Sequence, residues 1–223
     1  MIELATLPAV VGLFYMYIRD KYEKEPYLMA FVAFFLGISA TFLIYGFGEA
    51  LERSFPHTET PLYTAFVSSA FVEESVKFIF LYYFIWRNKN FNEPFDGIVY
   101  AVFISLGFAW VENLVYVLHP TIGGLTTGFS RAVFSVPSHG LFGVQMGYFF
   151  ALAKFHQKKS YLSFAFFVPY VVHAFYNYFL LKESPVYWIP FVILEILLWL
   201  FSLDFIRKLL EISPFRTGAK ILS

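Results

Sequence analysis

Long hydrophobic runs, separated by short polar segments, fill this chain. The runs cover residues 2–18, 27–48, 62–86, 98–118, 132–155, 161–181 and 185–206. A helix needs roughly 20 apolar residues to cross a lipid bilayer, and most of the runs are close to that length. The segments RDKYEKEP, RNKNFNEPFDG, HQKKS and KESP are typical of loops. The pattern therefore predicts an all-α polytopic membrane protein of about seven transmembrane helices, forming a single integral-membrane domain over residues 1–223.

The composition supports this class and excludes several others. The chain is 59% hydrophobic and 14% charged, whereas soluble domains carry about 25% charged residues. A net charge of zero gives no basis for binding nucleic acid. The absence of cysteine excludes disulfide and thiolate chemistry. No nucleotide, flavin or nicotinamide signature is present, so no small-molecule cofactor is expected.

Basic residues in alternate loops predict the orientation. If the N-terminus lies outside, the outer loops hold only Arg53 and Lys182, with Arg131 at a membrane boundary. The inner loops then hold twelve basic residues: Arg19, Lys21, Lys24, Arg87, Lys89, Lys154, Lys158, Lys159, Arg207, Lys208, Arg216 and Lys220. Lys and Arg are enriched in cytoplasmic loops. We therefore expect the N-terminus outside and the C-terminus in the cytoplasm of a bacterial cell.

Polar residues inside the four central runs need a physical reason, because a charge at a helix centre costs roughly 2.5–3.5 kcal/mol on insertion scales. They are Glu73, Glu74, Lys77, Glu112, Asn113, His139, His173 and Asn177. Counted from the outer helix ends at 1.5 Å per residue, the paired glutamates lie roughly 17 Å deep, Glu112 about 9 Å and the two histidines about 12 Å. Helices 62–86, 98–118, 132–155 and 161–181 are thus expected to form one site toward the outer face.

Local sequence adds detail to two of these helices. At 100° per residue, Lys77 projects between Glu73 and Glu74, and it balances only one of the two carboxylates. The small residues 68–70 before them allow another helix to approach closely. In the fifth run, Pro137 is expected to loosen the backbone just before His139.

This set of residues is suited to activating water, although other interpretations stay open. A carboxylate can take a proton from water, a second Glu or a His can protonate a leaving amine, and Asn177 can hydrogen-bond an oxyanion. His139, His173 and a Glu could instead hold a divalent metal such as zinc, although no HExxH motif is present. The same residues could serve as helix contacts in a scaffold, or as a relay in a proton- or cation-coupled transporter.

Taken together, the segments EESVK, GFAWVEN, SxPxH and HAFYN resemble the PrsW family of intramembrane proteases. The resemblance extends over nearly the whole chain, in the same order. It implies an intramembrane endopeptidase that makes the site-1 cut in a membrane-anchored anti-sigma factor of the RsiW type, during regulated intramembrane proteolysis. The expected partner is therefore a single-pass membrane protein.

The resemblance also implies roles for individual residues. Glu73 and Glu74 match the family's paired glutamates, and Lys77 the basic residue that closes their motif. Glu112 matches the glutamate of the second motif, and His139 and His173 match the two later histidines. Apart from the resemblance, Asn113, Arg131 and Asn177 are expected to support these catalytic candidates. In the related CAAX prenyl endopeptidases the second motif ends in His, where this chain has Glu112. The division of roles among the three glutamates is therefore left open.

Overall fold

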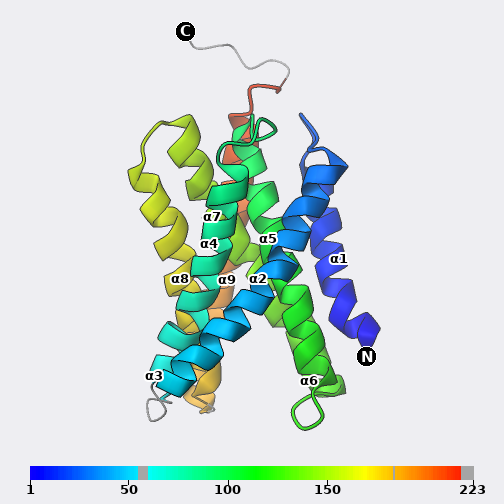
Figure 1. The fold of residues 1–223 in the computed structure, drawn as a ribbon, viewed down its shortest axis with the longest axis vertical. Coiled ribbons are helices and arrows are strands. Elements are labelled where there is room, and N and C mark those ends of the chain that lie inside the picture. The colour runs from blue at the N-terminus through cyan, green and yellow to red at the C-terminus, as the bar shows by residue number, and fades with distance from the viewer. Residues whose placement is uncertain (55–59, 183, 217–223) are drawn as a thin grey trace.

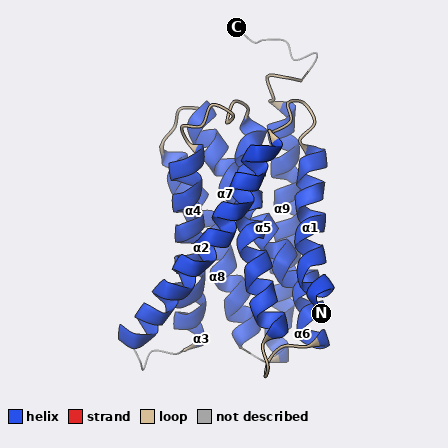
Figure 2. Ribbon diagram, turned by 45° about the vertical axis from the view of Figure 1, so that its right-hand side comes forward, coloured by secondary structure: helices blue, strands red, loops and turns tan. Residues whose placement is uncertain are grey.

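In a computed structural model, which describes residues 1–54, 60–182 and 184–216, the chain is a bundle of helices (Figure 1). Five of its rods are single α-helices: α1 (Ile2–Arg19), α2 (Tyr27–Ser54), α5 (Pro94–Leu118), α8 (Ser160–Leu181) and α9 (Trp188–Glu211). Two more rods are composite: α3 (Pro61–Tyr63), η1 (Thr64–Phe71) and α4 (Val72–Ile85); then α6 (Leu125–Ser130), η2 (Arg131–Ser135) and α7 (Val136–Phe155). The described residues contain no strand (Figure 2). The predicted all-α architecture is confirmed.

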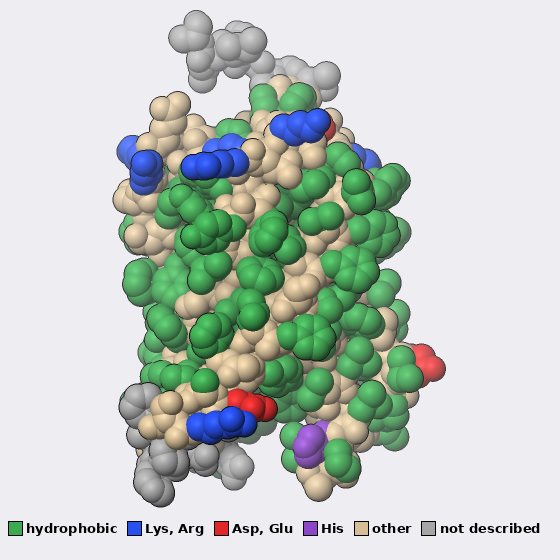
Figure 3. Space-filling model, viewed as in Figure 1, with side chains coloured by type: hydrophobic (Ala, Val, Ile, Leu, Met, Phe, Trp, Pro, Cys, Tyr) green, Lys and Arg blue, Asp and Glu red, His purple; other side chains and the backbone are tan. Residues whose placement is uncertain are grey.

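The surface is that of a membrane protein. Hydrophobic side chains form a broad band between two ends that carry the charged groups (Figure 3). Helices α1, α2, α5, α8 and the segment Pro185–Glu211 are long and apolar enough to cross a membrane. The two composite rods complete the bundle, and they carry Glu73, Glu74, Lys77, Arg131 and His139. Lys220, one of the twelve basic residues used for orientation, lies outside the described residues.

Hydropathy alone underestimates the length of two helices, because their polar ends lie outside the apolar runs. Helix α5 begins at Pro94, four residues before the predicted run, and α2 continues to Ser54 instead of ending near residue 48. At the start of α5, Oδ2 of Asp96 accepts hydrogen bonds from the backbone N–H groups of Asn92 and Glu93, both at 2.8 Å. These bonds satisfy amides that a helix start leaves free. Side-chain capping therefore extends the helix beyond its apolar part.

Helix α5 is the centre of the bundle. All residues from Pro94 to Ala109 are buried, as expected for a helix that is apolar on every side. Helices α1, α2 and α7 pack against it (Figures 1 and 2). Glu112, near its outer end, is thus carried on the most enclosed element of the fold.

Glycines bring neighbouring backbones into contact with α5. A Cβ atom at Gly37 of α2 would lie 2.0 Å from the carbonyl oxygen of Ile104, and one at Gly147 of α7 would lie 2.3 Å from that of Gly97. Both distances are too short for any side chain. Small residues allow such close helix packing in membranes. The two crossings set how near α2 and α7 lie to α5.

We expect Gly37→Ala to destabilise the protein. The added methyl group would separate α2 from α5, which should cost roughly 1–3 kcal/mol or more of unfolding free energy. Gly46→Ala on the same helix is the control, because a Cβ atom there meets nothing within 4 Å. Thermal unfolding in detergent measures both variants. Equal melting temperatures for the two would contradict the proposed backbone contact.

Candidate active site

Both composite rods contain a π-helical segment immediately before the site. Segment η1 ends at Phe71, just before Glu73 and Glu74 in the first turn of α4. Segment η2 ends at Ser135, shortly before His139 in the first turn of α7. The wider turn of a π-helix changes the direction of the side chains that follow, and such segments recur at functional sites. Pro137 had indicated a loosened backbone before His139, whereas no sequence signal predicted η1.

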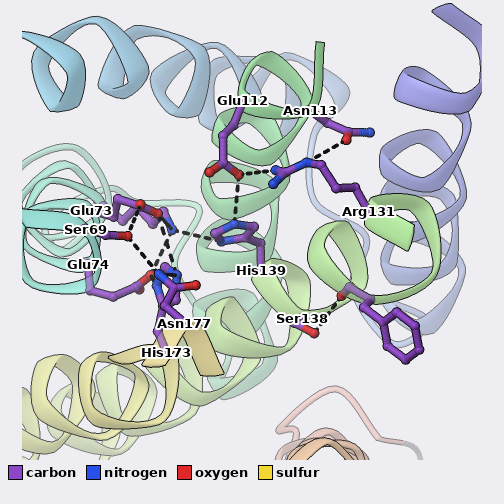
Figure 4. A network of polar contacts seen from close by, with 12 residues as sticks. Ser69, Glu73, Glu74, Glu112, Asn113, Arg131, Ser138, His139, His173 and Asn177 are labelled. Carbon is purple, nitrogen blue, oxygen red and sulfur yellow. Dashed lines mark hydrogen bonds and ion pairs between the residues drawn. The ribbon is translucent and has the colours of Figure 1, made fainter. Parts of the chain in front are cut away.

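Glu74 is the buried centre of one half of the site (Figure 4). Its Oε1 accepts a hydrogen bond from Nζ of Lys77 at 2.8 Å and lies 2.9 Å from Nδ1 of His173. Lys77 is also fully buried, and its Nζ lies 3.7 Å from Oε2 of Glu73. The single ammonium therefore compensates Glu74 directly and Glu73 only at longer range.

Glu73 is held at one of its two oxygens. Oε1 accepts a hydrogen bond from the hydroxyl of Ser69 at 2.9 Å, and Oγ of Ser69 accepts one from Nδ2 of Asn177 at 2.8 Å. Within the described part of the chain, Oε2 has no hydrogen-bond partner. It lies 3.9 Å from Nε2 of His173. Glu73 thus retains one carboxylate oxygen for a further ligand.

The other half of the site is built on Glu112 (Figure 4). Its Oε2 accepts a hydrogen bond from Arg131 at 2.6 Å and lies 3.1 Å from Nε2 of His139. Nε of Arg131 donates to Oδ1 of Asn113 at 3.0 Å. Nδ2 of Asn113 in turn donates to the carbonyl oxygen of Ala5 in α1, also at 3.0 Å. Glu112 therefore has its own counter-ion, and α1 helps to hold that counter-ion in place.

One contact joins the two halves and also indicates where the protons lie. Nζ of Lys77 lies 3.3 Å from Nδ1 of His139. An ammonium can only donate, so this nitrogen accepts, and Nε2 of His139 carries the proton toward Glu112. In His173, Nε2 lies 3.2 Å from Nδ2 of Asn177 and accepts from it, so Nδ1 carries the proton. The pattern is that of two neutral imidazoles.

A cavity of about 670 Å³ opens beside this network. Among the polar network residues, those that line it are Ser69, Glu73, Glu112, Arg131, His139, His173 and Asn177. Its rim includes Glu49 near the outer end of α2, and Trp188 at the outer end of α9. Glu74, Lys77 and Asn113 are not part of the lining. The cavity lies toward the end of the bundle that the charges of the loops predict to face outside.

The structure brings all nine residues singled out from the sequence into one connected network. They are Glu73, Glu74, Lys77, Glu112, Asn113, Arg131, His139, His173 and Asn177. Ser69 is an addition, since the sequence had indicated only a small residue for helix packing. A serine in a membrane helix commonly bonds to its own backbone, so nothing in the sequence distinguished it. The catalytic roles of these residues stay predictions.

The same residues match the donor types of a zinc site. Glu73, Glu74, His139 and His173 each offer a ligand atom, and these four atoms lie within 4.8 Å of one another. Two imidazoles and a carboxylate are donors that catalytic zinc takes in proteins. Lys77 lies among them, however, with Nζ at 2.8 Å from Glu74 and 3.3 Å from His139. A metal ion would therefore compete with this ammonium for the donor set.

Comparison with known proteins gives a consistent result. Residues 25–203 match the family described as PrsW family intramembrane metalloprotease. The chain is 38% identical over 186 residues to Protease PrsW of Geobacillus kaustophilus, covering 82% of this chain and 81% of the relative. It is 34% identical over 212 residues to Protease PrsW of Bacillus subtilis, covering 93% and 94% of the two chains. No solved structure matches this chain.

We expect Lys77→Met to destabilise the protein strongly, because it leaves Glu74 buried without a counter-ion. Breaking a buried ion pair on one side costs about 3–5 kcal/mol. The double variant with Glu74→Gln should recover part of this loss, since it removes the unpaired charge. Thermal unfolding in detergent measures both, with Lys208→Met on the exposed inner surface as control. A double variant less stable than Lys77→Met alone would contradict the pairing.

Metal affinity gives a second measurement on the same residue. If the Lys77 ammonium competes for the donor set, zinc should bind the Lys77→Met protein about tenfold or more tightly than the unchanged protein, because a positive charge is removed from the donors. Isothermal titration with zinc measures the affinity, and Lys208→Met is again the control. Unchanged affinity in Lys77→Met would show that zinc, if bound, takes other donors.

Proposed function

Because this chain belongs to the PrsW family of intramembrane proteases, we propose that its peptidase activity depends on a water molecule that Glu73 deprotonates. The observation that carries this proposal is the unpartnered Oε2 of Glu73, which belongs to a residue lining the cavity. A cysteine nucleophile is excluded, because the chain has no cysteine. The family membership favours a protease over the proton-coupled transporter considered from the sequence.

The charge balance of the network supports Glu73 as the general base. Glu74 is paired with Lys77 at 2.8 Å, and Glu112 is paired with Arg131 at 2.6 Å. Three carboxylates thus face two cations, and Glu73 is the carboxylate without a close cation of its own. A carboxylate already neutralised by a contacting cation is a poorer proton acceptor. In this proposal Glu74 and Lys77 are positioning residues that hold His173 and His139.

Hydrolysis by this route needs no covalent intermediate between the enzyme and the substrate. A water molecule near Oε2 of Glu73 and Nε2 of His173, which are 3.9 Å apart, gives its proton to Glu73 as its oxygen bonds to the scissile carbonyl carbon. Asn177 releases the amide N–H that it directs at Nε2 of His173 and turns it toward the resulting oxyanion. Glu73 then passes the proton to the amide nitrogen as the carbon–nitrogen bond breaks. Ser69 keeps the carboxylate of Glu73 oriented throughout.

A metal ion, which the family description implies, would fit the donor types at this position. Its holders in this chain would be His139, His173 and Glu73 or Glu74. A bound zinc ion would make a water molecule more acidic and would polarise the substrate carbonyl. With Glu74 as the carboxylate ligand, Glu73 would still be placed to move the proton.

The position of the cavity supports a membrane-anchored substrate. A single-pass helix that reached the cavity from the lipid would place a bond near its outer end beside Glu73. Together with the sequence resemblance, this supports an anti-sigma factor of the RsiW type as the substrate, cut at site 1 on the outer side of the membrane. An opening lined largely by apolar side chains is compatible with a helical segment that leaves the bilayer.

We expect Glu73→Gln to abolish cleavage of a single-pass substrate while the protein stays folded. Glutamine keeps an oxygen for Ser69 to donate to but has no basicity, and losing a general base typically costs about 10²–10⁴-fold in rate. Glu74→Gln should lower both the rate and the melting temperature. Glu195→Gln is the control, because Glu195 is also buried, bonds to Ser138 and does not line the cavity. Full activity in Glu73→Gln would exclude it as the base.

The substrate assignment has its own test. In cells that carry Glu73→Gln in place of the unchanged protein, an anti-sigma factor should accumulate uncut in the membrane, since the outer cut precedes any later one. Quantitative membrane proteomics of the two strains measures this. Accumulation of a different single-pass protein, with anti-sigma factors unchanged, would contradict the anti-sigma assignment and leave the protease assignment intact.

A further inference from the structure

A second buried polar cluster lies at the opposite, cytoplasmic end of the bundle. It is formed by five carboxylates from the α1–α2 loop and the start of α5: Asp20, Glu23, Glu25, Glu93 and Asp96. We call these residues the inner carboxylate cluster. Asp20, Glu93 and Asp96 have no exposed surface, and Glu25 is 2% exposed. So many enclosed carboxylates are unusual, because each costs free energy to remove from water.

Four members of the cluster use one oxygen in a hydrogen bond. Oδ2 of Asp20 accepts from the backbone N–H of Glu25 at 2.8 Å, and Oδ2 of Asp96 caps the start of α5 as described above. Glu25 accepts from the hydroxyl of Tyr100, and Glu93 from the hydroxyl of Ser213. These bonds fix the orientation of each carboxylate. They also tie the α1–α2 loop and the segment after α9 to the start of α5.

The remaining oxygens are buried and have no partner among the described residues. They are Oδ1 of Asp20, Oε2 of Glu23, Oε1 of Glu25, Oε1 of Glu93 and Oδ1 of Asp96. Buried polar atoms in folded proteins are nearly always satisfied, so an unpaired set points to a missing ligand. Since every member is a carboxylate oxygen, a ligand that accepts electron density and carries positive charge would satisfy them.

The spacing of these oxygens suits a metal ion. Ligand atoms of Asp20, Glu93 and Asp96 lie within 4.8 Å of one another, and so do those of Glu23, Glu25 and Asp96. Oxygens bound to one Ca²⁺ or Mg²⁺ ion lie about 2.0–2.6 Å from it. Two such ligands are therefore separated by at most about 5 Å. Asp96 belongs to both groups, so it is the common ligand.

No side-chain cation of the described residues compensates this charge. None of the five carboxylates lies within 4.0 Å of a Lys or Arg nitrogen. The nearby ammonium of Lys24 donates to the carbonyl oxygen of Tyr17, and that of Lys154 to the carbonyl oxygen of Phe91.

We propose that the inner carboxylate cluster binds a hard divalent cation, Mg²⁺ or Ca²⁺, through Asp96 together with Asp20 and Glu93, and with Glu23 and Glu25 around it. The bound ion links the α1–α2 loop to the start of α5 on the cytoplasmic side. All-oxygen donors select these ions over zinc or copper. The site is separate from the residues of the proposed protease mechanism, and it acts on the stability of the bundle.

Direct binding to the full-length protein in detergent tests the proposal. After treatment with a chelator, Mg²⁺ and Ca²⁺ are titrated separately, and binding is followed by calorimetry and by the rise in melting temperature that mass action requires. Saturable binding with a dissociation constant near 1 mM or tighter is expected for at least one ion. Asp96→Asn and Asp20→Asn should each weaken it about tenfold or more. Both asparagines keep an oxygen that can accept the backbone hydrogen bond.

Two controls separate this site from other sources of binding. Glu211→Gln, an exposed carboxylate at the same end of the bundle, and Glu73→Gln, in the outer network, should both leave the affinity unchanged. The proposal is overturned if neither ion binds saturably, or if binding persists in Asp96→Asn and Asp20→Asn. Loss of binding in Glu73→Gln alone would also overturn it, because the ion would then lie in the outer network.

Discussion

The ammonium of Lys77 is the contact on which the candidate active site depends. It is fully buried, and it reaches Glu74 at 2.8 Å, His139 at 3.3 Å and Glu73 at 3.7 Å. Two adjacent glutamates at this depth would otherwise repel each other in a medium that screens charge poorly. The ammonium pairs with one glutamate and orients an imidazole, which leaves the other glutamate only partly compensated. In the proposed mechanism, that asymmetry distinguishes Glu74, a positioning carboxylate, from Glu73, the general base.

The scaffold around Lys77 makes this arrangement rigid. Backbone contacts at Gly37 and Gly147 hold α2 and α7 against the enclosed α5, so Glu112 and His139 meet at a defined separation. The π-helical segments η1 and η2 then set the direction of the glutamates and of His139. Close helix packing in a membrane relies on such small residues, because lipid supplies no hydrophobic force between helices. The position of the site is therefore a consequence of packing at the centre of the bundle.

The two buried polar clusters differ in how their negative charge is compensated. In the outer network, which is the candidate active site, Lys77 and Arg131 face three carboxylates. Glu73, the carboxylate without a close cation of its own, lines the cavity. In the inner carboxylate cluster, no cation of the described residues lies within ion-pair distance, and hydrogen bonds to Tyr100 and Ser213 satisfy single oxygens. In the proposed mechanism, the first arrangement leaves Glu73 as a basic residue that lines the cavity. The second is satisfied best by a counter-ion from solution, and it joins the cytoplasmic ends of the bundle.

The sequence by itself determined the membrane class and the identity of the polar residues, because the free energy of moving apolar and charged residues between lipid and water depends directly on their type. The orientation stays a prediction from the charges of the loops. It also indicated that Lys77 lies between Glu73 and Glu74, since helical spacing is local. Only the tertiary structure decided that Asn177 bonds to Ser69, the residue that holds Glu73, and that Arg131 pairs with Glu112. Those contacts join different helices, and their geometry depends on crossings and π-helical turns that no local pattern encodes. For the same reason, only the fold showed that Asp20, Glu93 and Asp96 enclose one set of unpaired oxygens.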